Sequence, residues 1–270
     1  MNRPAEDIRQ SVRQHYSKVA DSVEGNLAAP SPCCGGLYEA EDLSRLPVEA
    51  IASSRGCGNP TALAALRPGE AVLDLGSGGG LDAFLAAQRV GPDGYVYGVD
   101  ATPSMIDLAR RNAARAGVDN VEFLPGDLED LPLPDETVDV ILSNCVVNLT
   151  PDKTQALREA FRVLRPGGRL AISDIVIDPD LSGFALSPAE IRQAVDWAGC
   201  AAGALTRAEW EQSLTEAGFS EIQLEIEYRM NKDDLPHEGS KLVGRLPEDQ
   251  LGQLANRFTS SAISARRPLE

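Results

Sequence analysis

The sequence predicts an α/β protein built on a doubly wound, mostly parallel sheet. Between residues 71 and 177, short apolar segments alternate with segments of helical periodicity. The apolar segments, among them AVLDLG and VDVILSN, are hydrophobic almost throughout, as expected for strands that are buried on both faces. A glycine-rich turn, DLGSGGG, connects the first predicted strand to a helix. This alternation is typical of a parallel sheet with helices on both of its faces.

Composition and charge limit the classes of partner. The 270 residues include 25 Lys and Arg against 41 Asp and Glu, which gives a formal net charge of −16. Such a charge repels phosphate backbones and anionic lipid, so we expect no nucleic-acid partner and no membrane partner. The N-terminus lacks the apolar core of a secretory signal, and no apolar run approaches the roughly 18 residues that span a bilayer. We therefore expect a cytoplasmic protein that acts on a small molecule.

The first predicted segment, residues 1–65, precedes the sheet and is expected to cover the active site. Apolar residues recur at helical spacing from Ile8 to Val19, which predicts an amphipathic helix packed against or over the main domain. Residues 27–60 are rich in Pro, Gly and Cys. They are predicted to form loops around one short helix over residues 41–52.

The main domain is predicted to span residues 66–230. Strands are expected in AVLDLG, YVYGVD, VEFLPGD, VDVILSN and RLAISDIV, and helices in LDAFLAAQRV, PSMIDLARRNAARAG and PDKTQALREAFRVL. Two further helices, over residues 187–198 and 206–217, precede the alternating strand EIQLEIEY. Residues 231–270 are weakly patterned and are expected to form a small C-terminal extension.

The glycine-rich turn indicates which kind of ligand binds at the sheet. Backbone N–H groups at the start of a helix can approach a ligand closely where glycines leave room. A dinucleotide-binding fingerprint would require glycine at position 81, which is Leu81, and the carboxylate of Asp74 beside the turn would repel a pyrophosphate. These two departures favour a ligand that has no pyrophosphate and carries a cationic group.

Acidic residues are predicted at three successive strand ends. Asp100 lies 26 residues beyond Asp74 and can accept hydrogen bonds from two ribose hydroxyls. After the third strand, the carboxylate of Asp127 and the backbone N–H of Leu128 could bind the edge of an adenine. Each aspartate could instead cap a helix or a turn. A nucleoside site at the carboxyl edge of the sheet accounts for all three together.

Four segments resemble the successive motifs of class I S-adenosylmethionine-dependent methyltransferases, namely DLGSGGG, GVDATPSM, GDLEDLPLPDETVDVI and LRPGGRLAISD. The resemblance covers roughly residues 66–230. It implies a Rossmann-like, seven-stranded sheet and S-adenosylmethionine as methyl donor. It also implies that Asp74 lies near the methionine ammonium group, that Asp100 holds the ribose and that Asp127 with Leu128 holds the adenine. The positions implied to bind the cofactor in these motifs are Asp74, Gly76, Ser77, Gly78, Asp100, Ala101, Asp127 and Leu128.

The five cysteines bear on the acceptor of the methyl group. In a reducing compartment they are expected to be free, metal-bound or redox-active rather than a disulfide framework. Cys57 stands in a glycine-rich loop, Cys145 just past the fourth strand and Cys200 at the end of a helical segment, without the C-x-x-C spacing of a zinc finger. Three converging thiolates would suit a soft, three-coordinate ion such as trivalent arsenic. The two histidines, His15 and His237, lie in no catalytic-looking setting, which weakens any mechanism that needs a histidine base.

The cysteine contexts narrow the resemblance. The segments SNCVVNLTPDK, RGCGNP and WAGCAAGAL, and VRQHYSKVA followed by a CC pair, resemble the arsenite methyltransferases. The resemblance implies that Cys57, Cys145 and Cys200 bind As(III), and that Asn144, Cys145 and Val146 also contact the cofactor. It implies further that Cys33 or Cys34 forms a disulfide with Cys57 during turnover, which thioredoxin or glutathione then reduces.

This family assignment implies methylation of thiolate-bound arsenite to mono- and dimethylated arsenicals, in arsenic detoxification. Two departures are visible: Arg55 stands where some members carry an aromatic residue, and no cysteine follows Cys200, whereas some members have a further C-terminal pair.

Two alternative functions remain open at the level of sequence. A carbon or oxygen methyltransferase for a small organic acceptor would use the same sheet, with the cysteines as buried structural residues. A non-enzymatic thiolate protein could bind metalloids, but it would not need acidic residues around a glycine loop.

Overall fold

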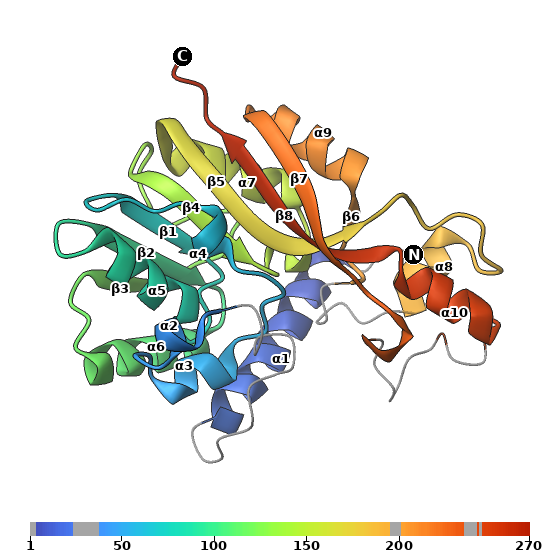
Figure 1. The fold of residues 1–270 in the computed structure, drawn as a ribbon, viewed down its shortest axis with the longest axis horizontal. Coiled ribbons are helices and arrows are strands. Elements are labelled where there is room, and N and C mark those ends of the chain that lie inside the picture. Colours follow the sequence, from blue (N-terminus) through green and yellow to red (C-terminus); the bar gives the residue numbers. More distant parts are fainter. Residues whose placement is uncertain (1–3, 24–37, 195–200, 235–241, 243–244) are drawn as a thin grey trace.

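The central element of the fold is one mixed sheet (Figure 1). The computed structural model describes residues 4–23, 38–194, 201–234, 242 and 245–270. The strands lie in the order β3-β2-β1-β4-β5-β8-β7, and the two-residue β6 pairs with β5. Their bounds are β1 Ala71–Leu75, β2 Tyr95–Asp100, β3 Val121–Pro125, β4 Val138–Asn144, β5 Leu164–Ile177, β6 Leu205–Thr206, β7 Ser220–Arg229 and β8 Phe258–Arg266.

Parallel pairing dominates the sheet. β3, β2, β1, β4 and β5 are mutually parallel, whereas β8 lies antiparallel between β5 and β7. The prediction of a doubly wound, mostly parallel sheet is therefore confirmed. The helices are α1 Ala5–Val23, α2 Ala40–Leu43, α3 Val48–Ser53, α4 Pro60–Leu63, α5 Leu81–Val90, α6 Pro103–Ala116, α7 Lys153–Val163, α8 Pro188–Ala194, α9 Arg207–Ala217 and α10 Glu248–Ala255, with short 3-10 turns at Val147–Leu149 and Lys232–Asp234.

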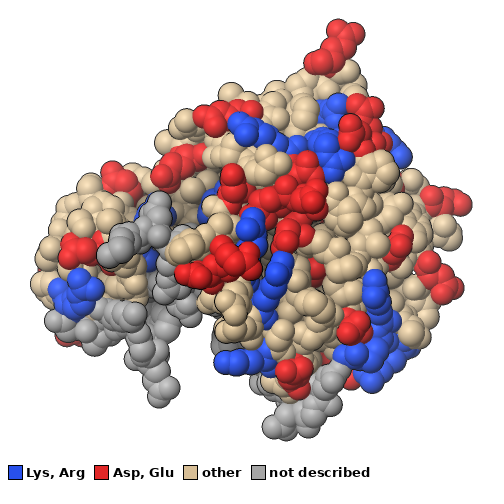
Figure 2. All heavy atoms as spheres, turned by 180° about the vertical axis from the view of Figure 1, so that it is seen from behind, with Lys and Arg blue, Asp and Glu red and all other residues tan. Residues whose placement is uncertain are grey.

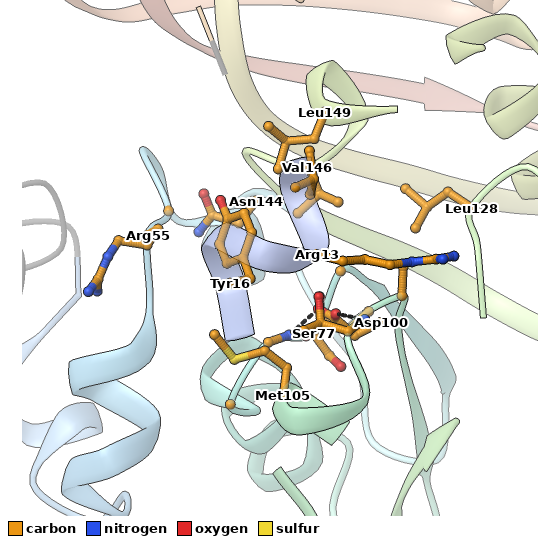
Figure 3. Close-up of a pocket in the computed structure, with 18 of the residues that line it drawn as sticks. Arg13, Tyr16, Arg55, Ser77, Asp100, Met105, Leu128, Asn144, Val146 and Leu149 are labelled. Carbon is orange, nitrogen blue, oxygen red and sulfur yellow. Dashed lines mark hydrogen bonds between the residues drawn. The ribbon is translucent and has the colours of Figure 1, made fainter. Parts of the chain in front are cut away.

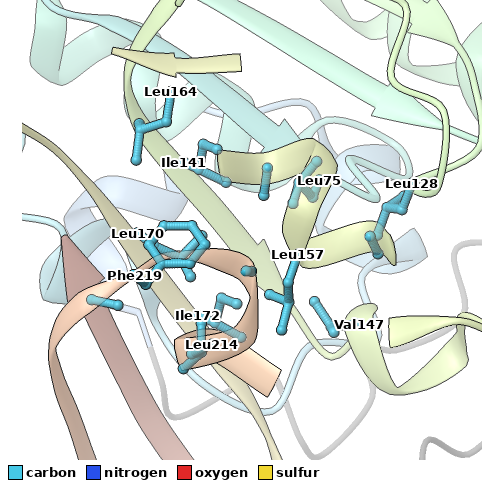
Figure 4. Packing of buried hydrophobic residues seen from close by; sticks show 14 of the residues in the cluster. Leu75, Leu128, Ile141, Val147, Leu157, Leu164, Leu170, Ile172, Leu214 and Phe219 are labelled. Carbon is cyan, nitrogen blue, oxygen red and sulfur yellow. The ribbon is translucent and has the colours of Figure 1, made fainter. Parts of the chain in front are cut away.

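Two apolar layers, one on each face, hold the sheet. On one face, Leu73 and Ile141 of the central strands pack with α7 and α9, a layer seen in Figure 4. On the other face, Val72 and Val140 pack with α5 and α6. Successive side chains of a strand point to opposite faces, so strands covered on both sides must be apolar at nearly every position. This is the pattern from which the sheet was predicted.

The N-terminal segment differs in part from the expectation. The amphipathic helix is present as α1, which packs against α3 and α6 through buried residues that include Val19 and Val23. The single helix expected over residues 41–52 is instead two, α2 and α3, which are separated around Pro47. Proline has no backbone N–H to donate within a helix, and it disfavours helical backbone at the preceding residue.

Part of the expected C-terminal extension lies inside the sheet. β8 pairs with β5 over nine residues and with β7 on its other edge, and Thr259, Ser260 and Ser261 within it are buried. These buried hydroxyls dilute the apolar pattern of the strand, and the Thr259 hydroxyl donates to the Val176 carbonyl at 3.0 Å. For this reason the β8 part of residues 231–270 looked weakly patterned.

The surface carries both signs of charge. Figure 2 shows acidic side chains across one face with Lys and Arg side chains between them, in keeping with the excess of 41 acidic over 25 basic residues. Within the described ranges, no helix has the length and apolar character that crossing a bilayer requires.

The position of β8 leads to a stability prediction. Ile263 is fully buried in the core that α7 and α9 cover, so Ile263→Ala should lower the free energy of unfolding by about 2–5 kcal/mol. Urea denaturation followed by circular dichroism would measure it. The matched control is Leu269→Ala, because Leu269 is 80% exposed and its loss should change stability by less than about 0.5 kcal/mol. Equal, small effects of the two substitutions would contradict the placement of β8 in the core.

Candidate functional site

A cavity opens at the carboxyl edge of β1, β2 and β4 (Figure 3). It encloses about 960 Å³ of space free of protein atoms, part of which is open solvent. All ten positions that the sequence implied for cofactor binding line it: Asp74, Gly76, Ser77, Gly78, Asp100, Ala101, Asp127, Leu128, Asn144 and Val146. Residues far apart in the chain are thus brought to one cavity wall.

The glycine turn forms the floor of the cavity through its backbone. Gly76 has a φ of 71°, and a Cβ at this position would lie 2.4 Å from the Val146 side chain, so only glycine fits. The carboxylate of Asp100 accepts hydrogen bonds from the Gly78 N–H at 3.0 Å and from the Thr102 N–H at 2.8 Å. Asp100 therefore ties the turn to the end of β2.

Three carboxylates face this turn. Asp74 lies within β1, one residue before the strand ends, and is 2% exposed. Burial, followed by the nearby Asp82 and Asp100, raises its pKa well above the usual range, and its Oδ2 accepts no hydrogen bond from the described residues. Burial also raises the pKa of Asp82 to about 6, opposed by hydrogen bonds from Asn144 and Tyr38. A cationic group in the cavity would relieve this concentration of buried negative charge.

Asp82 was missed by the sequence analysis. It stands in the first turn of α5, directly after the glycine turn, where an acidic residue reads as a favourable charge at a helix N-terminus. That ordinary interpretation hid the fact that its side chain is buried and lines the cavity.

Helix α1 closes the cavity at the side of Asp127. Arg13 donates to both carboxylate oxygens of Asp127 at 2.8 and 3.0 Å, and Arg9 donates to Glu129 at 3.2 Å. Both arginines line the cavity, together with Tyr16 of the same helix. The sequence predicted this helix as a cover but gave no signal for these ion pairs, because they join residues more than a hundred positions apart.

Cys57 and Cys145 lie beside the cavity and are joined by a disulfide, with their Cα atoms 6.1 Å apart. Cys145 is 4% exposed and has a φ of 58°, an unusual conformation for a residue other than glycine. The sequence implied that both would be arsenic ligands, and that Cys57 would pair with Cys33 or Cys34 during turnover. In this structure Cys57 is paired with Cys145, and the pairing expected during turnover stays a prediction. Cys33, Cys34 and Cys200 lie outside the described residues.

Asn144 explains why these two cysteines meet. Its Oδ1 accepts hydrogen bonds from the N–H groups of Cys57, at 2.9 Å, and Gly58, at 3.3 Å, while its Nδ2 donates to the Gly58 carbonyl at 2.9 Å. A side chain at the end of β4 therefore fixes the backbone of a loop 87 residues earlier. Cys145 follows directly, so the two sulfurs are brought together.

Asp174, in β5, is a further group at the cysteine pair that the sequence analysis missed. One of its oxygens and the two sulfurs all lie within 4.8 Å of one another. Asp174 is fully buried and accepts hydrogen bonds from the N–H groups of Asn148 and Ile175. Burial raises its pKa to about 7, against the opposing effect of those bonds and of the Lys153 charge.

Comparisons with known proteins agree with this geometry. A family described as a methyltransferase domain matches residues 66–218. An arsenite methyltransferase from Halobacterium salinarum is 41% identical over 284 residues, which cover 99% of this chain and 68% of that protein. One from Aquipseudomonas alcaligenes is 38% identical, over 80% of this chain and 63% of its own length. The crystal structure of an arsenic(III) S-adenosylmethionine methyltransferase from Chlamydomonas reinhardtii has a TM-score of 0.65 and 32% identity, over 89% of this chain and 74% of that one.

The buried carboxylates lead to a prediction on pH. The pKa of Asp82 is about 6 in the folded protein against an ordinary 3.8, so the folded state binds this proton more tightly than the unfolded state. The resulting stabilisation is complete below pH 3.8 and is lost as the pH rises through about 6. Relative to Asp82→Asn, the wild-type free energy of unfolding should therefore fall over this interval, by up to about 3 kcal/mol. Urea titrations at a series of pH values would measure the difference.

A control with the opposite sign is available. Arg162 lowers the pKa of Glu159, so the wild-type protein should gain stability relative to Glu159→Gln as the pH rises. A difference between wild type and Asp82→Asn that stays constant with pH would show that Asp82 is not held in this environment.

Proposed function

We propose that this chain, which belongs to the arsenite methyltransferase family, transfers a methyl group from S-adenosylmethionine to trivalent arsenic held by cysteine thiolates. The observation that carries the proposal is the position of the Cys57 and Cys145 pair. It lies beside a cavity with buried carboxylates. Asn144 lines this cavity and also holds the backbone of Cys57. A methyl donor in the cavity and an acceptor on the sulfurs would be neighbours.

The cavity suits S-adenosylmethionine because the Asp74 carboxylate is buried with one oxygen lacking a partner among the described residues. When bound, this cofactor supplies an electrophilic methyl group on a positively charged sulfur. We assign Asp74 to its ammonium group, Asp100 to the ribose, and Asp127 with Leu128 to the adenine. Gly76, Ser77, Gly78, Ala101, Asn144 and Val146 would form the surrounding wall.

The substrate is proposed to bind through Cys57, Cys145 and Cys200. Arsenite, As(OH)₃, exchanges each hydroxide for a thiolate, and each thiol proton leaves with that hydroxide as water. Three sulfurs leave arsenic with a lone pair directed away from them, so the nucleophile needs no base to deprotonate it. The contribution of the protein is then mainly proximity, which converts an encounter of two molecules into a step within one complex.

The disulfide must be reduced before arsenic can bind both sulfurs. Two electrons and two protons convert the Cys57–Cys145 bond into two thiols, and thiol–disulfide exchange can deliver them. We propose thioredoxin or glutathione as the source, with Cys33 or Cys34 as an intermediate thiol. This requirement favours a reducing compartment such as the cytoplasm.

Methyl transfer uses the arsenic lone pair, releases S-adenosylhomocysteine and oxidises As(III) to As(V). Two thiols, oxidised to a disulfide, return the arsenic to As(III) before a second methylation. Mono- and dimethylated arsenicals are the expected products, and arsenic detoxification is the expected role.

Product analysis tests the proposed reaction. Arsenite, S-adenosylmethionine and a thiol reductant should give methylated arsenic with the wild-type protein, measured by chromatography with arsenic detection. Without the thiol no product should form. Cys145→Ser should lower the rate on the order of 100-fold or more, because arsenic loses a ligand that holds it near the methyl group.

Binding of S-adenosylhomocysteine is the control for this variant. Cys145→Ser should retain it, because the cavity acids are unchanged. Undiminished methylation by Cys145→Ser would contradict the proposed acceptor site. A wild-type protein that binds S-adenosylhomocysteine but forms no methylated arsenic would point to an organic acceptor instead.

A further inference from the structure

A buried hydrogen-bond network connects the cavity to the cysteine loop. Asp82 lines the cavity, and its carboxylate accepts the Tyr38 hydroxyl at 2.9 and 3.1 Å and the Asn144 Nδ2 at 3.1 Å. The same Nδ2 lies 2.9 Å from the Tyr38 oxygen. Tyr38 and Asp82 are both 7% exposed. Polar side chains from the N-terminal segment, α5 and β4 thus share one contact, in which Tyr38 and Asp82 are buried and Asn144 is partly buried.

The network fixes which way the Asn144 amide points. Its amide nitrogen faces the Asp82 carboxylate and the Gly58 carbonyl, which are acceptors, and its oxygen faces the Cys57 and Gly58 N–H groups, which are donors. A flipped amide would place oxygen against oxygen and nitrogen against nitrogen. Removing any one partner would also leave a polar group of the network unpaired and shielded from water, which is unfavourable. Asp82 therefore helps to orient the group that holds the Cys57 backbone.

We propose that Tyr38 and Asp82 are positioning residues for the arsenic site, and that a cationic ligand in the cavity strengthens their hold on the Cys57 loop through Asn144. This proposal rests on the proposed function, which identifies the ligand in the cavity as S-adenosylmethionine and the ligand at the cysteines as arsenite. The set of Tyr38, Asp82 and Asn144 is called the clamp below.

The charge on Asp82 links the two sites. An ionised carboxylate accepts stronger hydrogen bonds than a neutral one, but burial disfavours ionisation of Asp82. A ligand with an ammonium group in the cavity favours the ionised form, in which Asp82 accepts from both Tyr38 and Asn144. The Cys57 backbone is then held more firmly beside Cys145. Both sulfurs are therefore in place to bind arsenic. Cofactor and arsenite should therefore bind cooperatively, and each should tighten the other by the same factor.

Tyr38→Phe tests the clamp without altering the cavity, because Tyr38 is not among the residues that line it. Tyr228→Phe is a matched control, since it also removes a tyrosine–aspartate hydrogen bond, to Asp234 at 2.7 Å, but at an exposed position on β7. Arsenite affinity would be measured by equilibrium dialysis, with and without saturating S-adenosylhomocysteine, which carries the ammonium group and cannot react. A phosphine keeps the cysteines reduced, because dithiols would chelate the arsenic.

In the wild type and in Tyr228→Phe, S-adenosylhomocysteine should tighten arsenite binding by at least about 5-fold. In Tyr38→Phe the factor should fall below about 2-fold when it is measured at S-adenosylhomocysteine concentrations that saturate the variant. Asp82→Asn is a second variant and should also lose the coupling, with weaker S-adenosylhomocysteine binding because Asp82 lines the cavity. Equal coupling in wild type and Tyr38→Phe would overturn the proposal, and so would a wild type without coupling.

A second readout needs no arsenic. When the reduced protein is mixed with oxidised glutathione, the Cys57–Cys145 disulfide re-forms and two molecules of reduced glutathione are released. The clamp holds the two thiols together, so Tyr38→Phe should re-form the bond more slowly than Tyr228→Phe, and S-adenosylhomocysteine should accelerate only the control. Mass spectrometry after alkylation measures this rate. Identical rates in the two variants would overturn the clamp.

The two proposals can fail separately. If wild-type protein shows coupling and fast disulfide formation but makes no methylated arsenic, the clamp stands and the proposed reaction fails. If methylation proceeds and Tyr38→Phe behaves as wild type in both readouts, the reaction stands and the clamp fails.

Discussion

The side chain of Asn144 pairs with the backbone of Cys57 and Gly58 as a neighbouring strand would, using its oxygen for two N–H groups and its nitrogen for a carbonyl. It sits at the carboxyl end of β4, where the parallel sheet opens its ligand cavity, and Cys145 follows it directly. The approach is so close that a Cβ on Gly56 would overlap the Asn144 amide. Together with the hydrogen bond that the Ser260 hydroxyl donates to the Cys57 carbonyl at 2.6 Å, this contact holds the loop and its cysteine at the edge at which the cavity lies.

The charges around the cavity are arranged in two groups. Asp74, Asp82 and Asp100 lie at the glycine turn, and their pKa values are raised mainly by burial. The arginines of α1 lie at the other side and pair with Asp127 and Glu129. In the first group negative charge is buried without a cation among the described residues that pairs with it. Such an arrangement stores unfavourable energy in the free protein, and a cationic ligand releases it on binding. A positively charged methyl donor is the chemical complement.

The sequence was sufficient for the parts of this protein that depend on local pattern. Near-continuous apolar strands and the glycine turn predicted the sheet, and the cavity is lined by every residue that the methyltransferase motifs implied. It was not sufficient where chemistry depends on contacts between distant segments. Asp82 has the position of an ordinary acidic residue at a helix start, and buried hydroxyls in β8 obscured the apolar pattern of a strand that is paired on both sides. The pairing of Cys57 with Cys145 spans 88 residues, and no local pattern encodes it.

The proposed reaction requires that arsenic binds the sulfurs of Cys57 and Cys145 beside the cofactor cavity. The most direct test is the X-ray absorption spectrum at the arsenic edge of the reduced protein with an equimolar amount of arsenite and saturating S-adenosylhomocysteine. Sulfur should replace the oxygen neighbours of free arsenite around the arsenic atom, and Cys57→Ser and Cys145→Ser should each remove a sulfur from that shell. An arsenic atom that keeps its oxygen neighbours in the wild-type protein, or a sulfur shell that neither substitution changes, would contradict it.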